Sequence, residues 1–432
     1  MDLWPGRLPP AGRLLLCILP LLGCGNNTGT FAATDAAAYQ PLAEAGTDPP
    51  GWAQAEARTG LTSGSACDAG AQCLSGACTL GACSDWGHAM RIAIDTTAAG
   101  ADIRGPVADF PLLVRLDAKS FSFAEARGDG ADIRFVDGSG RSLSHEIERW
   151  DEKQGVADLW VLVPRIEGDR RDNAVLMYWG NPLAAPTSSG PSVFGECAAV
   201  LHMTPDPDGV ASHLGDSSGK NDYGVVQNPA PASTHPESIA GPYLALDGHG
   251  TYVSTATHLM SPQSFTLSLW LATTSISRAG VVGFNNEASG NSLKYDRSIA
   301  IDESGRISFG IVLLGYLTTV STLTGYNDGA WHLVTARFSK AGQYLFVDGE
   351  PAADAPASNA VDSYPGSWHL GQEALASAPA PTTDAAAPPG NYFTGALDEL
   401  RITTDEQSDD WIKLVYATQR PRATAVSYQR LP

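Results

Sequence analysis

Residues 264–274 read SFTLSLWLATT, and they alternate between apolar and polar side chains with a period of two. Phe265 and the leucines at every second position after it fall on one face, whereas Trp270 falls on the other. A β-strand presents successive side chains to opposite faces of its sheet. The segment therefore predicts a strand with one face in an apolar core.

Similar segments recur along the chain, and the 45 glycines and 29 prolines indicate many turns and few long helices. Hydrophobic residues make up 43% of the 432 residues and charged residues 17%, which is enough apolar material for sizeable cores. The strand-like runs include FPLLVRLD (110–117), DLWVLVP (158–164), AVLMYWGN (174–181), AWHLVTARF (330–338) and QYLFVDGE (343–350). The pattern predicts an all-β chain.

The formal net charge is −20. An acidic surface repels phosphate backbones, so we expect no nucleic-acid partner. The excess of carboxylates suits Ca²⁺, which takes oxygen ligands. The alternative is that the charge only keeps an exported protein soluble.

The N-terminus has the order of an export signal. Two arginines precede the apolar run LLLCILPLL (14–22), which is too short to span a bilayer, and Cys24 follows it. LLGC resembles the lipobox of bacterial lipoproteins, which implies that residues 1–23 are a signal peptide and that Cys24 carries lipid. Gly25 rather than Asp follows, which favours the outer membrane over the inner membrane. An ordinary secretory signal is the alternative.

Residues 24–66 are rich in Ala, Gly, Thr and Pro, and we expect a flexible linker. Residues 67–84 then form a cysteine-rich segment. Its four cysteines lack the Cys-x-x-Cys spacing of zinc sites, so two disulfides are expected, with three pairings open: Cys67, Cys73, Cys78 and Cys83. Cys197 is left over, and we expect a buried, inert thiol.

Residues 85–183 resemble the bacterial domain of unknown function 2341, which has no established activity. The resemblance rests on Trp86 and on FPLLVRLD, DGADIRFVDGSG, LSHEIERWD, LWVLVP and MYWGN. A first β-sandwich is therefore expected here.

Residues 194–406 resemble the LamG-like, concanavalin A-type jelly roll. The resemblance rests on DSSG, LDG, FTLSLW, DGAWHLV, LFVDG and FTGALDELRI, in this order. It implies a second, antiparallel two-sheet sandwich. Residues 407–432 then form a C-terminal helix and tail, in which Trp411, Leu414 and Val415 share a helical face that caps the sandwich.

Asp398 and Glu399 are adjacent acids within the strand NYFTGALDELRITT. Strict alternation places Asp398 with Leu400 and Ile402, and places Glu399 on the opposite face with Leu397. A buried lone carboxylate is costly, so Asp398 is expected to be hydrogen-bonded or metal-bound. Three roles stay open for it: structural hydrogen bonding, a structural Ca²⁺ site, and catalysis.

The LamG resemblance implies loop ligands near Asp216 or Asp247 for a calcium ion bound by Asp398. Catalysis is disfavoured because a glycosidase needs two carboxylates on either side of one bond, whereas neighbouring strand residues diverge. GDSSG (215–219) lacks the following helix of a nucleophile elbow. No catalytic residue is assigned, and we expect that the chain is not an enzyme.

A sugar site needs aromatic rings beside polar groups. Trp270, Tyr316, Tyr326 and Trp368 are the candidates, although packing of Trp270 under a neighbouring strand is favoured over exposure. We therefore expect an outer-membrane lipoprotein, periplasmic or surface-exposed, whose LamG-like domain binds carbohydrate or another polymer without catalysis. The alternatives are a structural or adhesion protein that binds envelope proteins and, less favoured, a glycan-active hydrolase.

Overall fold

The computed structural model describes residues 78–79, 82–83, 85–228, 234–235, 238–290, 292–373 and 391–431. The predicted signal peptide, Cys24, the linker, Cys67 and Cys73 lie outside these residues. Cys78 and Cys83 face each other in the ladder between β1 (Cys78–Thr79) and β2 (Ala82–Cys83). Their pairing in disulfides stays a prediction, whereas Cys197 is a buried free thiol, as expected.

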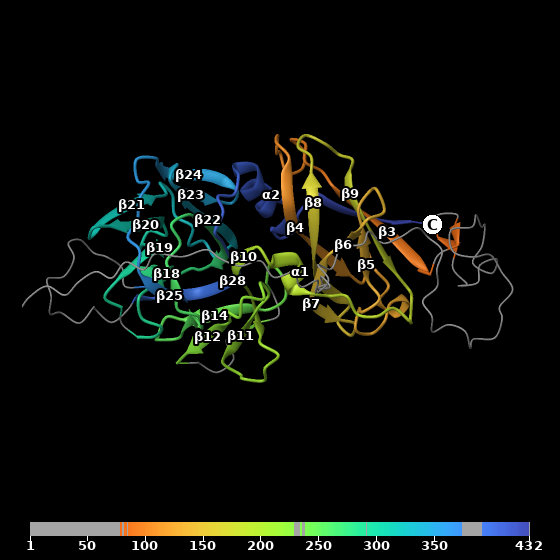
Figure 1. The fold of residues 1–432 in the computed structure, drawn as a ribbon, viewed down its shortest axis with the longest axis horizontal. Coiled ribbons are helices and arrows are strands. Elements are labelled where there is room, and N and C mark those ends of the chain that lie inside the picture. The colour runs from red at the N-terminus through yellow and green to blue at the C-terminus, as the bar shows by residue number, and fades with distance from the viewer. Residues whose placement is uncertain are drawn as a thin grey trace, which may run out of the picture. The chain divides into compact units, whose positions relative to one another are not determined.

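The first sandwich packs two antiparallel sheets around one core (Figure 1). The three-stranded sheet has the order β4-β8-β7 and the five-stranded sheet the order β29-β3-β9-β5-β6. The strands are β3 (His88–Ile94), β4 (Val107–Asp117), β5 (Arg134–Val136), β6 (Ser142–Leu143), β7 (His145–Asp151), β8 (Val156–Ile166), β9 (Asn173–Trp179) and β29 (Val426–Leu431).

The second sandwich is one hydrogen-bonded ladder of strands that closes on itself around an apolar core. The strand predicted from SFTLSLWLATT, β17 (Phe265–Ala272), pairs with β22 (His332–Ser339) on one side and with β28 (Thr394–Thr403) on the other. The first half comprises β10 (Cys197–Pro205), β11 (His213–Asp216), β12 (Gly224–Gln227), β13 (Thr234–His235), β14 (Tyr243–Asp247), β15 (Tyr252–Thr255), β16 (Leu259–Met260), β17 (Phe265–Ala272), β18 (Ala279–Asn285) and β19 (Tyr295–Ile301).

The second half of this sandwich comprises β20 (Ile307–Leu313), β21 (Tyr316–Ser321), β22 (His332–Ser339), β23 (Gly342–Val347), β24 (Glu350–Ala355), β25 (Pro365–Leu370) and β28 (Thr394–Thr403), and β26 (Gln372–Glu373) pairs separately with β27 (Asn391–Tyr392). The core comes from alternate residues of these strands, with Phe265 fully buried. The all-β prediction with two sandwich domains is confirmed.

Two helices contribute to the contact between the sandwiches. Ser408 caps the N-terminus of α2 (Asp409–Gln419), and Ser189 caps that of the short α1 (Gly190–Phe194). The apolar face of α2 packs on the first sandwich, where the rings of Trp411 and Phe110 lie 6.0 Å apart. The same core also includes Trp270 of the second sandwich. The helix therefore joins the two sandwiches and does not merely cap the second.

The C-terminal segment is more than a tail. β29 forms six antiparallel residue pairs with β3, from Val426 opposite Ile94 to Leu431 opposite Ala89. The first sandwich is thus built from both ends of the described chain, and the prediction of a simple tail after the helix is wrong. None of the helices in the described residues is long and apolar enough to cross a membrane.

A buried histidine and carboxylate cluster between the sandwiches

The strand β28 carries a β-bulge at Glu399. Its register against β17 shifts at this point, and Glu399 has a φ of 54°. Leu397 and Leu400 therefore both enter the core of the second sandwich, although they are three residues apart. Asp398 and Glu399 lie together on the other side of the sheet. The expectation that the two acids point to opposite faces is wrong, because a bulge re-aims the side chains beside it.

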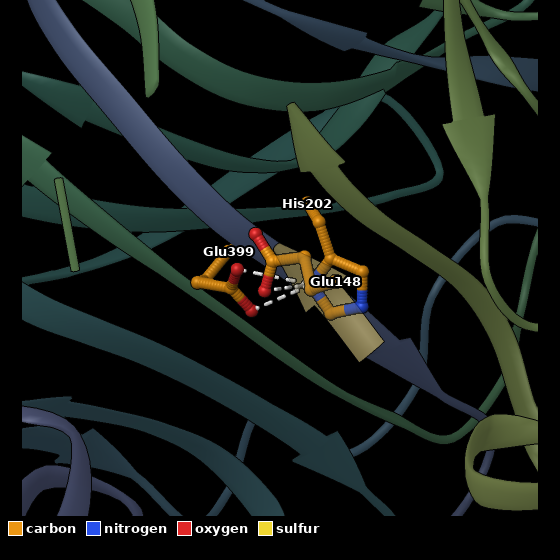
Figure 2. A group of neighbouring side chains, drawn as sticks. All are labelled: Glu148, His202 and Glu399. Carbon is orange, nitrogen blue, oxygen red and sulfur yellow. Dashed lines mark hydrogen bonds and ion pairs between the residues drawn. The ribbon is translucent and has the colours of Figure 1, made fainter. Parts of the chain in front are cut away.

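Two further strand irregularities bring partners to Glu399. The ladder of β10 is irregular between residues 201 and 205, where His202 precedes Met203 with a φ of 57°. The ladder of β7 shifts between residues 147 and 149, at Glu148. Both side chains are directed towards Glu399 (Figure 2). Glu148 comes from the first sandwich, whereas the other two residues come from the second.

Carboxylates surround the imidazole of His202 on both sides. Its Nδ1 lies 2.9 Å from each carboxylate oxygen of Glu399 and 3.6 Å from Oε2 of Glu148. Its Nε2 lies 3.5 Å from Oε2 of Glu146. Trp160 stacks on the imidazole at a centroid distance of 5.4 Å, and its indole N–H donates a 2.8 Å hydrogen bond to Glu148.

The cluster is inaccessible to solvent. The side chains of His202, Glu148 and Glu399 are 1%, 1% and 3% exposed. Burial lowers the pKa of His202, but the charges of Glu399 and Glu148 outweigh it and hold that pKa well above its usual value. Burial and the charge of Glu399 raise the pKa of Glu148. Charged groups with so little solvent need compensating partners.

Several polar atoms of the cluster nonetheless lack a hydrogen-bond partner among the residues that the structure describes. These atoms are Oε1 of Glu148, Nε2 of His202, Oε2 of Glu146, and Nε and Nη1 of Arg401. The guanidinium of Arg401 lies over the rings of Phe194 and Trp160, at 4.8 and 5.2 Å from their centroids. The cluster is therefore rich in charge and poor in hydrogen bonds.

The chemistry of this donor set fits a cation. Glu148, His202 and Glu399 each offer one ligand atom, and these atoms lie within 4.8 Å of one another. In the described residues these three form the group of His, Cys, Asp or Glu side chains whose ligand atoms lie close enough together to hold a metal ion.

Asp398 holds a loop. Its Oδ2 accepts hydrogen bonds from the amides of Ile239 (2.8 Å) and Ala240 (3.4 Å), and Oδ1 accepts one from the amide of Glu399 (2.9 Å). The next amide of the loop, that of Gly241, donates to Asp158 of the first sandwich at 3.0 Å. Burial and the charge of Glu399 raise the pKa of Asp398.

The predicted calcium ligands do not come together in the described residues. Asp216 accepts hydrogen bonds from Val200 and from its own loop, and Asp247 accepts one from His249. Oδ2 of Asp398 accepts from the 239–240 amides and Oδ1 accepts from the amide of Glu399, and the three aspartates form no joint group of ligand atoms in the described residues, so the predicted ligand set is wrong. Calcium elsewhere on the chain stays a prediction.

The predicted sugar-binding aromatics are also scattered. Trp270 is fully buried and stacks on Tyr416 of α2, and Trp368 lies in the core of the second sandwich. These two rings offer no face to a ligand, because α2 and the core cover them. Tyr326 is partly buried against the core, whereas Tyr316 is 80% exposed.

A pocket opens beside the cluster, between the two sandwiches and the end of α2. Its volume is about 850 Å³, and the loop 238–241 forms part of its wall. Its lining includes Trp331, Asp158 and four basic side chains, namely Arg115, Lys119, Arg149 and Arg422. We call it the junction pocket. Arg115 is tied to the carbonyls of Ile239, Thr418 and Gln419.

The sequence carried weak signals for the cluster. In HEIERWD, Glu146 and Glu148 are two residues apart on a strand, and in VLHM the polar His202 interrupts an apolar run. Each pattern alone is compatible with a solvated strand face. Only the packing of the two sandwiches brings these side chains together.

Two family models match the chain. Residues 129–196 match the domain of unknown function DUF2341, and residues 247–413 match the concanavalin A-like lectin/glucanases superfamily. The expected order of the two domains is confirmed. No curated protein matches the chain.

Solved structures resemble parts of the chain at low identity. The receptor binding domain of botulinum neurotoxin mosaic serotype C/D is 15% identical, with a TM-score of 0.35, over 51% of this chain and 50% of that one. The binding domain of botulinum neurotoxin DC, in complex with SialylT, is 13% identical, with a TM-score of 0.37, over 52% of this chain and 52% of that one. A SAP-like pentraxin from Limulus polyphemus is 14% identical, with a TM-score of 0.30, over 41% of this chain and 84% of that one. The match covers about half the length of the toxin domains.

Proposed function

We propose that this chain, which carries a concanavalin A-like segment after a DUF2341 segment, is a non-catalytic glycan-binding protein. We further propose that an acidic glycan occupies the junction pocket. The observation that carries the proposal is the basic lining of this pocket, with four Arg and Lys side chains and two Asp, in a chain of net charge −20. A local excess of positive charge attracts an anionic ligand.

The half-buried Trp331 supplies the apolar ring on the same wall. Its indole packs edge-on to Tyr243 at a centroid distance of 5.5 Å, which limits the motion of its ring. A sugar ring stacks on such a surface, while polar groups around it bind hydroxyl and carboxyl groups.

A glycan array that contains neutral and carboxylated or sulfated glycans tests the proposal. We expect binding to acidic glycans that Trp331→Ala and Arg149→Gln each weaken. Tyr316→Ser is the matched control, because Tyr316 is an exposed aromatic on β21 outside the pocket. Loss of binding in Tyr316→Ser with retention in Trp331→Ala would move the site to the β20–β21 hairpin.

The non-catalytic role is supported by the location of the acids. Asp398 and Glu399 lie in a buried cluster and hold a loop and an imidazole, whereas a glycosidase needs acids that face a bound sugar. Release of reducing sugar from a bound glycan, abolished by Glu399→Gln, would contradict this part of the proposal.

Export and attachment to the outer membrane through Cys24 are also part of the proposal. The order of basic residues, apolar run and cysteine supports them. Mass spectrometry of the mature protein is expected to find lipid on Cys24, and Cys24→Ser is expected to release the chain from membranes.

A second function, adhesion to an envelope protein, is favoured by one observation. The β20–β21 hairpin exposes Leu313, Leu314, Tyr316 and Leu317, which are 39–80% exposed. Exposed apolar patches often mark protein contacts. Envelope proteins recovered with the parent chain but not with Leu314→Ser, together with a negative glycan array, would favour this function.

A further inference from the structure

We infer that Glu148, His202 and Glu399 form a binding site for a divalent transition-metal ion of the zinc type, which links the two sandwiches. The inference goes beyond glycan binding and does not depend on it. It rests on the spacing of the donors, on the surroundings of the histidine, and on a buried oxygen of Glu148 that lacks a hydrogen-bond partner among the described residues.

The spacing fits ligands around one ion. Donors about 2.1 Å from one zinc ion, at angles of roughly 90–110°, stand about 3.0–3.4 Å apart. Nδ1 of His202 lies 2.9 Å from the oxygens of Glu399 and 3.6 Å from Oε2 of Glu148. A small movement of these side chains is enough to place an ion among them.

The surroundings match those of a metal-bound imidazole. A ligating histidine usually points its other ring nitrogen at a carboxylate, and ligating carboxylates are themselves hydrogen-bonded. Nε2 of His202 faces Glu146 at 3.5 Å, and Trp160 donates a 2.8 Å hydrogen bond to Glu148. Both supporting contacts are present from residues outside the ligand set.

The donor set also selects the type of ion. Ca²⁺ takes oxygen ligands, whereas one imidazole with carboxylates suits zinc and its neighbours. The side chain of Glu148 is 99% buried, yet within the part of the chain that the structure describes its Oε1 has no hydrogen-bond partner. The three carboxylates of the cluster outnumber its cationic partners, the imidazole of His202 and the guanidinium of Arg401, and a divalent ion offsets the remaining negative charge.

The space beside Glu148 depends on Gly241. A Cβ on this residue, which has a φ of 55°, would lie 2.1 Å from Oε1 of Glu148. Gly241→Ala would therefore displace the carboxylate without changing a ligand. It offers a second way to perturb the site.

The full chain, produced in zinc-supplemented medium and purified without chelator, tests the inference by elemental analysis. We expect about one zinc per chain and a thermal midpoint that falls when the metal is removed by a chelator. Glu399→Gln and Glu148→Gln are expected to lose the metal. Glu303→Gln, which changes an exposed glutamate in an ion pair with Arg278, is the control and should keep it.

Co²⁺ supplies an independent readout, because bound Co²⁺ absorbs visible light according to its ligands. We expect this absorption in the parent, and about a 10- to 100-fold weaker affinity in Glu146→Gln. A parent chain that is folded but holds no zinc and takes up no Co²⁺ would overturn the inference. Metal retained in both folded ligand variants would overturn it equally, and would leave an imidazolium and carboxylate ion cluster as the role of these residues.

Discussion

His202 and Glu399 are 197 positions apart in the chain, yet Nδ1 of His202 lies 2.9 Å from both oxygens of the Glu399 carboxylate. Both residues belong to the second sandwich, on β10 and β28, and the first sandwich closes over them with Glu148 and Trp160. The contact between the sandwiches is therefore organised around charged groups that are almost fully excluded from solvent.

Trp160→Phe tests the support of the cluster. The change removes the indole N–H that donates to Glu148, and leaves a buried carboxylate with one partner fewer. We expect a loss of about 1–3 kcal/mol in the free energy of unfolding, measured in urea. Trp150→Phe is the matched control, because the buried indole N–H of Trp150 has no hydrogen-bond partner in the described part of the chain. Equal losses in the two variants would show that packing alone matters.

Asp398→Ala tests the loop 238–241. It removes the acceptor of the Ile239 and Ala240 amides, and we expect a loss of about 1–3 kcal/mol in stability. Since the loop lines the junction pocket, glycan binding is expected to weaken as well. Asp398→Asn keeps one carbonyl oxygen and removes a costly buried charge, so its loss should be smaller. A larger loss in Asp398→Asn than in Asp398→Ala would contradict this role.

His145 predicts a pH dependence of stability. Burial and the charge of Arg134 lower its pKa from 6.5 to about 4 in the folded chain. The unfolded state then binds more protons between these values, so the stabilisation is complete above pH 6.5 and is lost as the pH falls towards 4. The full loss is roughly 3 kcal/mol. Urea unfolding from pH 7 to pH 4 should show a shallower fall in His145→Gln, and identical slopes would refute the assignment.

Glycan binding in the junction pocket should depend on salt. The Debye length falls from about 30 Å at 0.01 M to about 8 Å at 0.15 M ionic strength, which screens the attraction to the basic lining. We expect the affinity for an acidic glycan to fall over this range, measured by calorimetry. Lys119→Gln should make the dependence less steep. An affinity that does not change with salt would point to stacking on Trp331 alone.

Removal of residues 424–432 tests the role of β29. The truncation exposes the edge of β3 and removes Tyr428, whose hydroxyl accepts a 3.0 Å hydrogen bond from the amide of Arg115. We expect a destabilised first sandwich, seen as an earlier unfolding transition. Tyr428→Phe isolates the hydroxyl and should cost about 1 kcal/mol. An unchanged transition in the truncated chain would show that β29 contributes little.

The alternation in residues 264–274 was sufficient to predict β17 and its buried leucine face, because the periodicity of a strand is a local property. The spacing of the apolar residues around Trp411 likewise predicted the helix α2. In both segments the chain's own pattern determines the structure, and the tertiary environment only completes the burial.

The geometry of the site, by contrast, was determined by the tertiary structure. A prediction from alternation assumes that the strand is regular, whereas β28 has a bulge at Glu399. The direction of the Asp398 and Glu399 side chains could therefore not be predicted from the sequence. Trp270 faces away from the leucines and is buried, as favoured from the sequence, but the element that stacks on its ring is α2, from more than a hundred residues further along, and not a neighbouring strand.

The sequence by itself thus determined the strands, because hydrophobic periodicity and turn residues act over a few neighbours, while the two sandwiches and their order followed from the resemblance of its motifs to two known families. The tertiary structure alone decided which polar side chains meet. His202, Glu148 and Glu399 lie on three strands whose encounter depends on packing between two sandwiches, and no local pattern encodes such a long-range contact.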